Sequence, residues 1–155
     1  MMENADMPTE PTGLSRRMLL SIAASFALPA IARAQEVYVM RIRFIFADQA
    51  FTATLEDNPS ARDLFDMLPL DLTVEDYSTN EKIAYLSRKL TEEGSGPFGN
   101  EVPGDLCYYA PWGNLAMFHA PYRWSRGLIR LGRLDGGPAP LLVRGEYPLR
   151  VEPLA

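Results

Sequence analysis

Residues 106–119 read LCYYAPWGNLAMFH, and this stretch gives the clearest indication of the fold. Two short apolar runs, 106–109 and 115–119, flank the segment 110–114. Pro, Gly and Asn in that segment favour a chain reversal, and each apolar run has the length of a typical strand. The stretch therefore predicts two strands joined by a tight turn, with Trp112 at the tip.

Further strands are predicted on both sides of this hairpin. Residues 37–46 alternate in polarity, which predicts a half-buried strand with Tyr38 on its buried face, and residues 51–55 predict its antiparallel partner. Asn58 and the proline after it predict a capped start for a short helix that Pro69 ends. Additional strands are predicted at 70–74, 81–86, 128–134 and 147–151. About eight short strands without a strand–helix–strand rhythm predict a mainly β fold, a closed antiparallel barrel or a sandwich, with one short capping helix.

Composition limits the chemistry of the chain. The 155 residues fit one domain, and 47% apolar with 23% charged residues is typical of a globular protein. The net charge of −5, with no Lys/Arg cluster, argues against nucleic acid as a partner. Cys107 and His119 are the only residues of their types, which excludes an internal disulfide and multi-cysteine metal sites. We predict no cofactor and no metal site.

The first 34 residues carry the features of an export signal. Arg16 and Arg17 precede an uncharged, mostly apolar run at 18–31, and Ala32 and Ala34 are the small residues that signal peptidase prefers. A run of about 14 residues is too short to span a bilayer, which needs roughly 20. Residues 1–34 are therefore predicted to be a cleaved signal peptide of the twin-arginine type. A buried or amphipathic N-terminal helix is the alternative, but the run has no polar face.

The prediction makes residues 35–155 a single exported domain, periplasmic or secreted and without a stable membrane span. The signal segment carries three acids and three arginines, so the mature domain keeps the charge of −5. The lone Cys107 is compatible with the twin-arginine route, in which a protein folds before export and cannot depend on disulfides formed afterwards.

Four stretches of the mature region resemble one known family. They are DNPSARDL at 57–64, EKIAYLSRKL at 81–90, PGDLCYYAPWGN at 103–114 and GLIRLG at 127–132. Together they resemble the bacterial cyclophilin-like domain family, small barrels of largely unassigned function. The resemblance covers nearly the whole mature region and implies a closed barrel of about eight strands with the cyclophilin fold.

The resemblance to true cyclophilins does not extend to their active site. Their catalytic arginine has its nearest counterpart in Arg88, within Leu-Ser-Arg, while their Gln-Gly-Gly segment, active-site Trp and Lys-His-Val element have no matching positions. An arginine alone cannot stabilise a twisted amide. We therefore predict a binding module for a small molecule or a peptide, without catalytic residues. The alternatives are a divergent periplasmic peptidyl-prolyl cis-trans isomerase that uses Arg88, and a partner-docking domain.

Four of the five candidate binding residues come from three loops, 94–103, 110–114 and 121–127, which we expect on one side of the barrel, and Arg88 follows the strand predicted at 81–86. An aromatic rim of this kind suits a small or peptide ligand. The candidates are Arg88, Phe98, Trp112, Tyr122 and Trp124. Each also has a structural interpretation: Arg88 as a surface ion-pairing residue, and Trp112 as a side chain folded back over the barrel end.

Other chemically distinctive residues are predicted to be structural. Tyr108 and Tyr109 point to opposite faces of a strand, so only one can belong to the core. Cys107 shares a face with Tyr109 and is predicted to be an inert buried thiol. His119 is predicted to be a hydrogen-bonded structural histidine, and Asp105 a surface loop acid.

Overall fold

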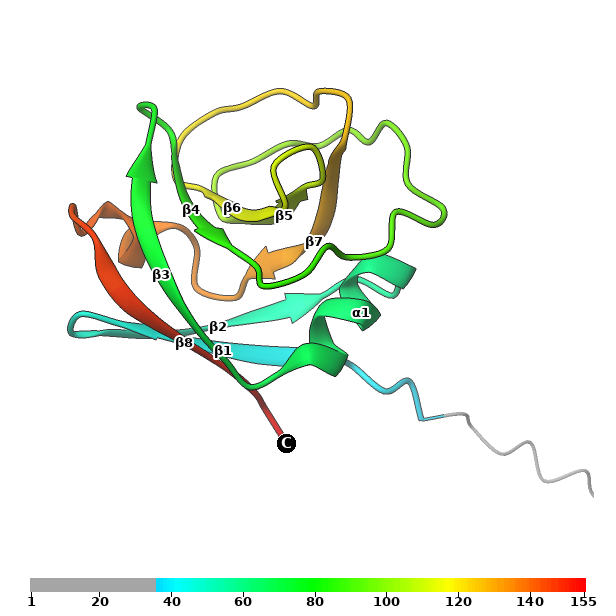
Figure 1. Cartoon of the computed structure of the whole chain (residues 1–155), viewed down its shortest axis with the longest axis horizontal. Helices are drawn as coiled ribbons and strands as arrows, with labels where there is room; N and C mark the ends of the chain where they lie inside the picture. Colours follow the sequence, from blue (N-terminus) through cyan, green and yellow to red (C-terminus); the bar gives the residue numbers. More distant parts are fainter. Residues whose placement is uncertain (1–35) are drawn as a thin grey trace, which may run out of the picture. The chain divides into compact units, whose positions relative to one another are not determined.

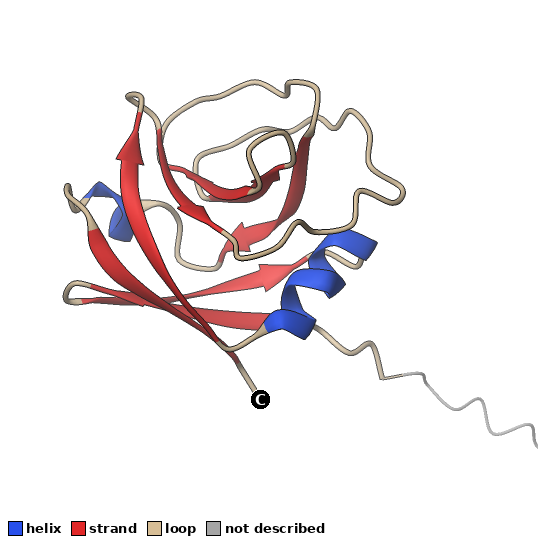
Figure 2. Cartoon of the chain, viewed as in Figure 1, coloured by secondary structure: helices blue, strands red, loops and turns tan. Residues whose placement is uncertain are grey.

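The computed structural model describes residues 36–155, so the predicted signal peptide lies outside the described residues. Eight strands and two short helices make up the described domain (Figures 1 and 2). The elements are β1 (Arg41–Phe46), β2 (Gln49–Leu55), α1 (Pro59–Met67), β3 (Leu70–Tyr77), β4 (Glu81–Tyr85), β5 (Asp105–Tyr109), β6 (Asn114–Phe118), β7 (Leu128–Leu134), the 3-10 helix η1 (Ala139–Leu142) and β8 (Tyr147–Pro153).

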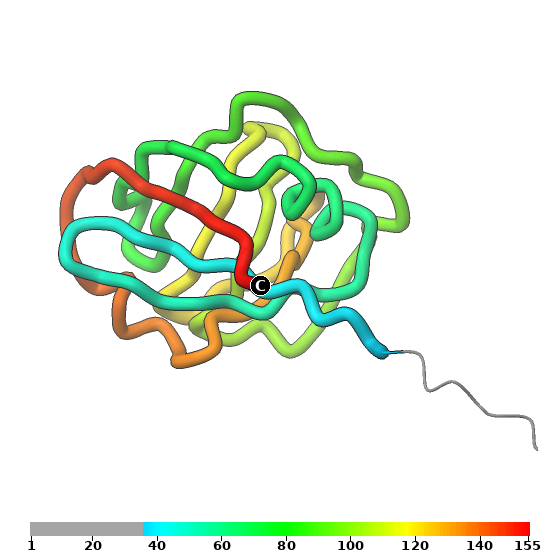
Figure 3. Tube along the Cα trace, turned by 90° about the horizontal axis from the view of Figure 1, so that it is seen from below, coloured from blue at the N-terminus to red at the C-terminus, as the bar shows by residue number. Residues whose placement is uncertain are grey.

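The strands form a closed antiparallel barrel in the order β1-β2-β7-β5-β6-β4-β3-β8. Closure comes from β8, which pairs with β1 on one side and β3 on the other. The tube in Figure 3 shows β8, in red, running between these two strands. Closing a sheet removes its exposed edges. The predicted mainly β barrel of about eight strands is therefore confirmed.

Alternating side chains fill the barrel interior. Ile42, Phe44 and Phe46 of β1 are buried, while Arg41 and Arg43 point to the opposite face and are exposed. Helix α1 begins after Asn58, whose side-chain oxygen accepts the Ala61 N–H at 2.8 Å. It adds its buried apolar side chains to the same core. The predicted helix cap and the strand alternation are both confirmed.

Strands β5 and β6 are buried on both faces. Their inner face belongs to the barrel core and carries Leu106, Tyr108, Leu115 and Met117. Their outer face supports a second, smaller apolar cluster of Cys107, Ala116, Phe118, Tyr122 and Leu128. Tyr108 and Tyr109 point to opposite faces as predicted: Tyr108 has no exposed surface, whereas Tyr109 packs against the outer cluster.

Two local predictions are wrong. Strand β1 begins at Arg41, and Tyr38 is 74% exposed, because the pairing of β1 with β2 and β8 starts only at Arg41 and Ile42. Asp105 is the first residue of β5 and has no exposed surface, because Arg133 of the neighbouring strand supplies a positive partner at 2.7 Å. Within residues 36–155, no helix is long and apolar enough to cross a bilayer.

Candidate functional site

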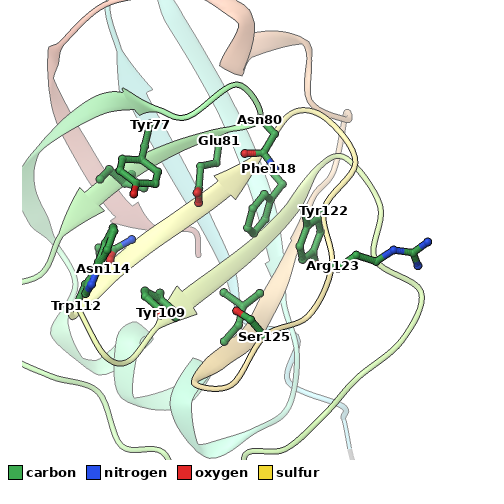
Figure 4. Close-up of a pocket in the computed structure, with 12 residues that line it drawn as sticks. Tyr77, Asn80, Glu81, Tyr109, Trp112, Asn114, Phe118, Tyr122, Arg123 and Ser125 are labelled. Carbon is green, nitrogen blue, oxygen red and sulfur yellow. The ribbon is translucent and has the colours of Figure 1, made fainter.

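A pocket of about 310 Å³ lies on the outer face of β4, β6 and β5, on the side of these strands away from the barrel core (Figure 4). Its volume is at the lower end of the range for small-molecule sites. Five of its twelve lining residues are aromatic, and five others carry polar or charged side chains. The lining residues are Tyr77, Asn80, Glu81, Ile83, Tyr109, Trp112, Asn114, Phe118, Tyr122, Arg123, Ser125 and Leu128.

The turn between β5 and β6 positions Trp112 at the pocket. Gly113 adopts a φ of +73°, a left-handed conformation that suits glycine, and its N–H donates to the Tyr109 carbonyl at 2.9 Å. The Trp112 ring stands edge-on to Tyr77 and Tyr109, with ring centroids 5.3 and 5.5 Å apart. Trp112 remains 47% exposed. The side chain therefore forms a positioned wall of the pocket and does not fold into the barrel.

Tyr122 forms the opposite wall, and a buried carboxylate holds it. Its ring stacks on Phe118 with centroids 3.7 Å apart, and its hydroxyl donates to Asp105 Oδ2 at 2.7 Å. The other Asp105 oxygen accepts from Arg133 Nε at 2.7 Å. Burial is the main cause that raises the pKa of the Tyr122 hydroxyl, which keeps this donor protonated. The wall is therefore rigid before any ligand arrives.

The two loops that border the pocket are fixed to each other. The Ala110 N–H donates to the Gly127 carbonyl at 2.9 Å. Gly127 has a φ of +89°, and a Cβ added there would lie 2.7 Å from Cδ of Pro111. A glycine is required at 127 on both counts. This contact fixes the 110–114 turn against the 121–127 loop.

Two polar groups in the pocket lack partners in the described part of the chain. Glu81 makes no hydrogen bond or ion pair there, and burial raises the pKa of its carboxyl group to about 7. Asn114 is 1% exposed; its Nδ2 donates to the Leu115 carbonyl at 3.0 Å, and its Oδ1 has no partner. An unpaired buried acceptor costs about 1–3 kcal/mol. The Glu81 carboxyl is therefore the acceptor that a bound molecule would satisfy, whereas the Asn114 amide oxygen is enclosed by the protein.

Only part of the predicted rim meets at this pocket. The loops 110–114 and 121–127 line it through Trp112 and Tyr122. Trp124 is not among the lining residues: it packs against the outer cluster, and its Nε1 donates to the Leu128 carbonyl at 3.0 Å. Arg88 pairs with Asp63 of α1 at 2.7 Å and is not among the lining residues.

Phe98 lies at a second pocket, of about 290 Å³, between the 93–98 loop and the strand β7. The Arg130 guanidinium lies 4.6 Å from the centroid of the Phe98 ring. Arg130 also donates to Glu56 at 2.7 Å and to the Gly99 carbonyl at 2.9 Å. Arg130 and Glu56 of this second pocket thus satisfy each other.

The remaining distinctive residues are structural. The Cys107 thiol has no exposed surface, and burial raises its pKa to about 12, as expected for an inert thiol. The prediction of a hydrogen-bonded His119 is wrong for its Nε2, which is buried without a partner among residues 36–155. Burial lowers the pKa of His119, so that the imidazole is held neutral.

Sequence reasoning missed Tyr77, Glu81 and Asn114. Tyr77 and Glu81 sit opposite each other on β3 and β4, and Glu81 also faces Phe118 of β6. Strand β5 lies between β4 and β6 in the sequence, so no local pattern predicts that β4 pairs with β6. The available signal was an acidic residue at the start of a strand whose last three residues are apolar.

The fold and the pocket define a small antiparallel barrel that carries a concave site outside its core. The sequence profile of the Cyclophilin-like family matches residues 44–152, and the chain belongs to this family. The predicted family resemblance is thereby confirmed.

A comparison with solved structures identifies the same fold in an archaeal protein. The chain is similar to the hypothetical protein AF2241 from Archaeoglobus fulgidus, whose solution structure it matches with a TM-score of 0.59 and 20% identity. The match covers 74% of this chain and 94% of the archaeal one. Among curated proteins, no significant match is found.

Proposed function

We propose that this protein is a binding module whose ligand, a small molecule or one or two side chains of a peptide, occupies the outer-face pocket. One observation carries the proposal: aromatic side chains surround the Glu81 carboxyl, which has no hydrogen-bond or ion-pair partner in the described part of the chain. A partly desolvated carboxyl without a partner is costly in a folded protein and calls for an explanation. The arrangement supplies recognition groups, with no nucleophile paired to a base among the lining residues.

A fluorescence titration of the purified protein tests the proposal. Three probes of similar size but different charge are used: benzyl alcohol, benzylamine and benzoate. We expect at least one probe to change the tryptophan emission saturably, and Trp112→Ala to weaken its binding about fivefold to tenfold through loss of aromatic contact. The matched control is Phe98→Ala, which removes an aromatic ring at the second pocket. Binding to this variant is followed through the Trp112 emission and should be unchanged. Failure of all three probes to bind overturns the proposal.

The isomerase alternative depends on Arg88, whose guanidinium donates a hydrogen bond to Asp63. We expect no acceleration of cis–trans exchange above background in a proline-containing tetrapeptide, measured by NMR exchange spectroscopy. A clear acceleration that Arg88→Ala abolishes would establish the isomerase in place of the binding module.

Export is the second part of the proposal. Arg16 and Arg17, the apolar run at 18–31 and the small residues at 32 and 34 support cleavage before Gln35 and delivery to the periplasm or the exterior. The mature N-terminus should therefore be residue 35, and the double variant Arg16→Lys, Arg17→Lys should accumulate uncleaved in the cytoplasm. A full-length wild-type chain that stays inside the cell contradicts export. Normal export of the double variant contradicts only the twin-arginine route.

A further inference from the structure

The outer-face pocket contains one acidic side chain, Glu81, whose carboxyl makes no hydrogen bond or ion pair in the described part of the chain. When ionised, this carboxyl accepts hydrogen bonds and donates none. Asn114 lies at the other end of β6, opposite Tyr85 of β4, and its unpartnered amide oxygen has almost no accessible surface. A ligand that fits Glu81 must therefore bring a positive charge or hydrogen-bond donors.

The Glu81 carboxyl is the charged group at the centre of the pocket. It projects into the space enclosed by the lining side chains, whereas the Arg123 side chain extends away from that space (Figure 4). The neighbouring Lys82 points to the other side of β4, where it binds Asp76 at 2.7 Å and has no exposed surface. No cation among residues 36–155 neutralises Glu81, so its carboxyl is free to pair with a positively charged ligand.

The pocket wall suits a positive charge as well. Tyr77, Tyr109 and Trp112 form one edge-to-face group, and Phe118 with Tyr122 forms a stacked pair. The faces of aromatic rings carry negative potential and attract ammonium groups placed over them. The net charge of −5 over the chain adds long-range attraction for a cation.

We propose that the outer-face pocket binds a protonated amine carried on a small apolar or aromatic group, with its N–H groups donated to Glu81. This inference rests on the proposed binding function and specifies its ligand class. Glu81 supplies the charge, and the aromatic side chains contact the substituent and the cation.

The same geometry makes binding depend on pH. Burial raises the pKa of Glu81 to about 7, and a cation binds only the ionised form of this carboxyl. The titratable groups around Glu81 are the phenols of Tyr77, Tyr109 and Tyr122 and the outward guanidinium of Arg123. The nearby His119 interacts with Arg144, Asp76 and Lys82, and Glu81 is not among the groups that shift its pKa. Glu81 is therefore the group expected to titrate between pH 6 and pH 8.

The experiment compares probes that differ in charge and in donors. We use benzylamine, benzyltrimethylammonium and benzyl alcohol, titrated by isothermal calorimetry and by tryptophan fluorescence at pH 8. The expected order is benzylamine first, because it is charged and donates N–H groups, then benzyltrimethylammonium, which is charged without N–H donors, then neutral benzyl alcohol. Glu81→Gln should weaken both cations about tenfold or more and leave benzyl alcohol unchanged. The matched control, Glu92→Gln, removes the same charge from an exposed loop and should change nothing.

A pH series on the wild-type protein tests the inference without a variant. Binding of benzyltrimethylammonium, whose charge does not titrate, should tighten about tenfold from pH 6 to pH 8, as the ionised fraction of Glu81 rises. If benzyl alcohol binds in a Trp112-dependent manner while the cations bind no better and Glu81→Gln has no effect, the amine inference is overturned and the binding function stands. If no probe of either charge class binds, both fail.

Discussion

The two faces of strands β5 and β6 differ in how completely they are satisfied. On the inner face, Leu106 and Tyr108 have no exposed surface, and the Tyr108 hydroxyl accepts the Leu90 N–H at 3.1 Å. On the outer face, Tyr109 and Asn114 border a pocket, and the amide oxygen of Asn114 has no partner among the described residues. Burial on the inner face stabilises the fold, whereas the outer face carries a pocket and an unpaired polar group that the fold does not require.

The largest expected effect comes from a cavity on the inner face. Leu106→Ala removes a fully buried side chain from the barrel core and should lower the free energy of unfolding by about 2–5 kcal/mol. Urea unfolding followed by circular dichroism measures the loss. A loss below about 1 kcal/mol would contradict the assignment of the stabilising contacts to the inner face.

The next effect concerns the buried carboxylate behind the pocket. Asp105 accepts hydrogen bonds from Arg133, Tyr122 and the Val102 N–H, so Asp105→Asn should cost about 1.5–3 kcal/mol. The control is Asp71→Asn, whose partner Arg150 and own carboxylate are both accessible to solvent and whose loss should cost at most about 1 kcal/mol. Thermal unfolding of the two variants compares them directly. Equal shifts in melting temperature would show that Asp105 does not anchor the outer wall.

A smaller effect is expected at the contact between the two pocket loops. Gly127→Ala places a side chain at a left-handed φ and against Pro111, which should cost about 1–2 kcal/mol from the conformation alone. Gly136→Ala is the control, because a Cβ there meets nothing within 4 Å and its φ is not left-handed. Chemical denaturation of both variants, with a probe titration, separates stability from pocket shape. A neutral Gly127→Ala variant would mean that the loops are not fixed to each other.

A fourth expected effect is the pH dependence of stability from Glu81. Its pKa is raised to about 7 in the folded protein and lies near the ordinary value of 4.5 in the unfolded chain. Between these values the folded state binds more protons, so this group makes the free energy of unfolding fall as pH rises from about 4.5 to 7. Glu81→Gln should remove that part of the slope in denaturation series across this range. An unchanged slope would show that the carboxyl is well solvated and that the outer face resembles ordinary surface.

The fold was predictable because local patterns determine it. The apolar runs 106–109 and 115–119, the cap at Asn58 and the opposite faces of Tyr108 and Tyr109 all follow from residues close together in sequence. The barrel register does not follow in this way.

The site was only half predictable for the same reason. Trp112 and Tyr122 stood out as large aromatics in loops, and both line the pocket. Glu81 reaches it only because β4 pairs with β3 and with β6, and Asp105 is buried only because Arg133 lies on the strand beside it. Such cross-strand partners come from register, which single-sequence patterns do not specify.

A chemical-shift map with benzylamine at pH 8 tests the central claim most directly. In ¹⁵N-labelled protein, we expect saturable shifts of the Asn114 side-chain amide and of the backbone amides of Tyr109 and Glu81. The amide of Leu106 and the 93–98 segment at the second pocket should stay unchanged. Shifts confined to that second pocket, or spread evenly over the barrel, would contradict the claim that the outer-face pocket is the ligand site.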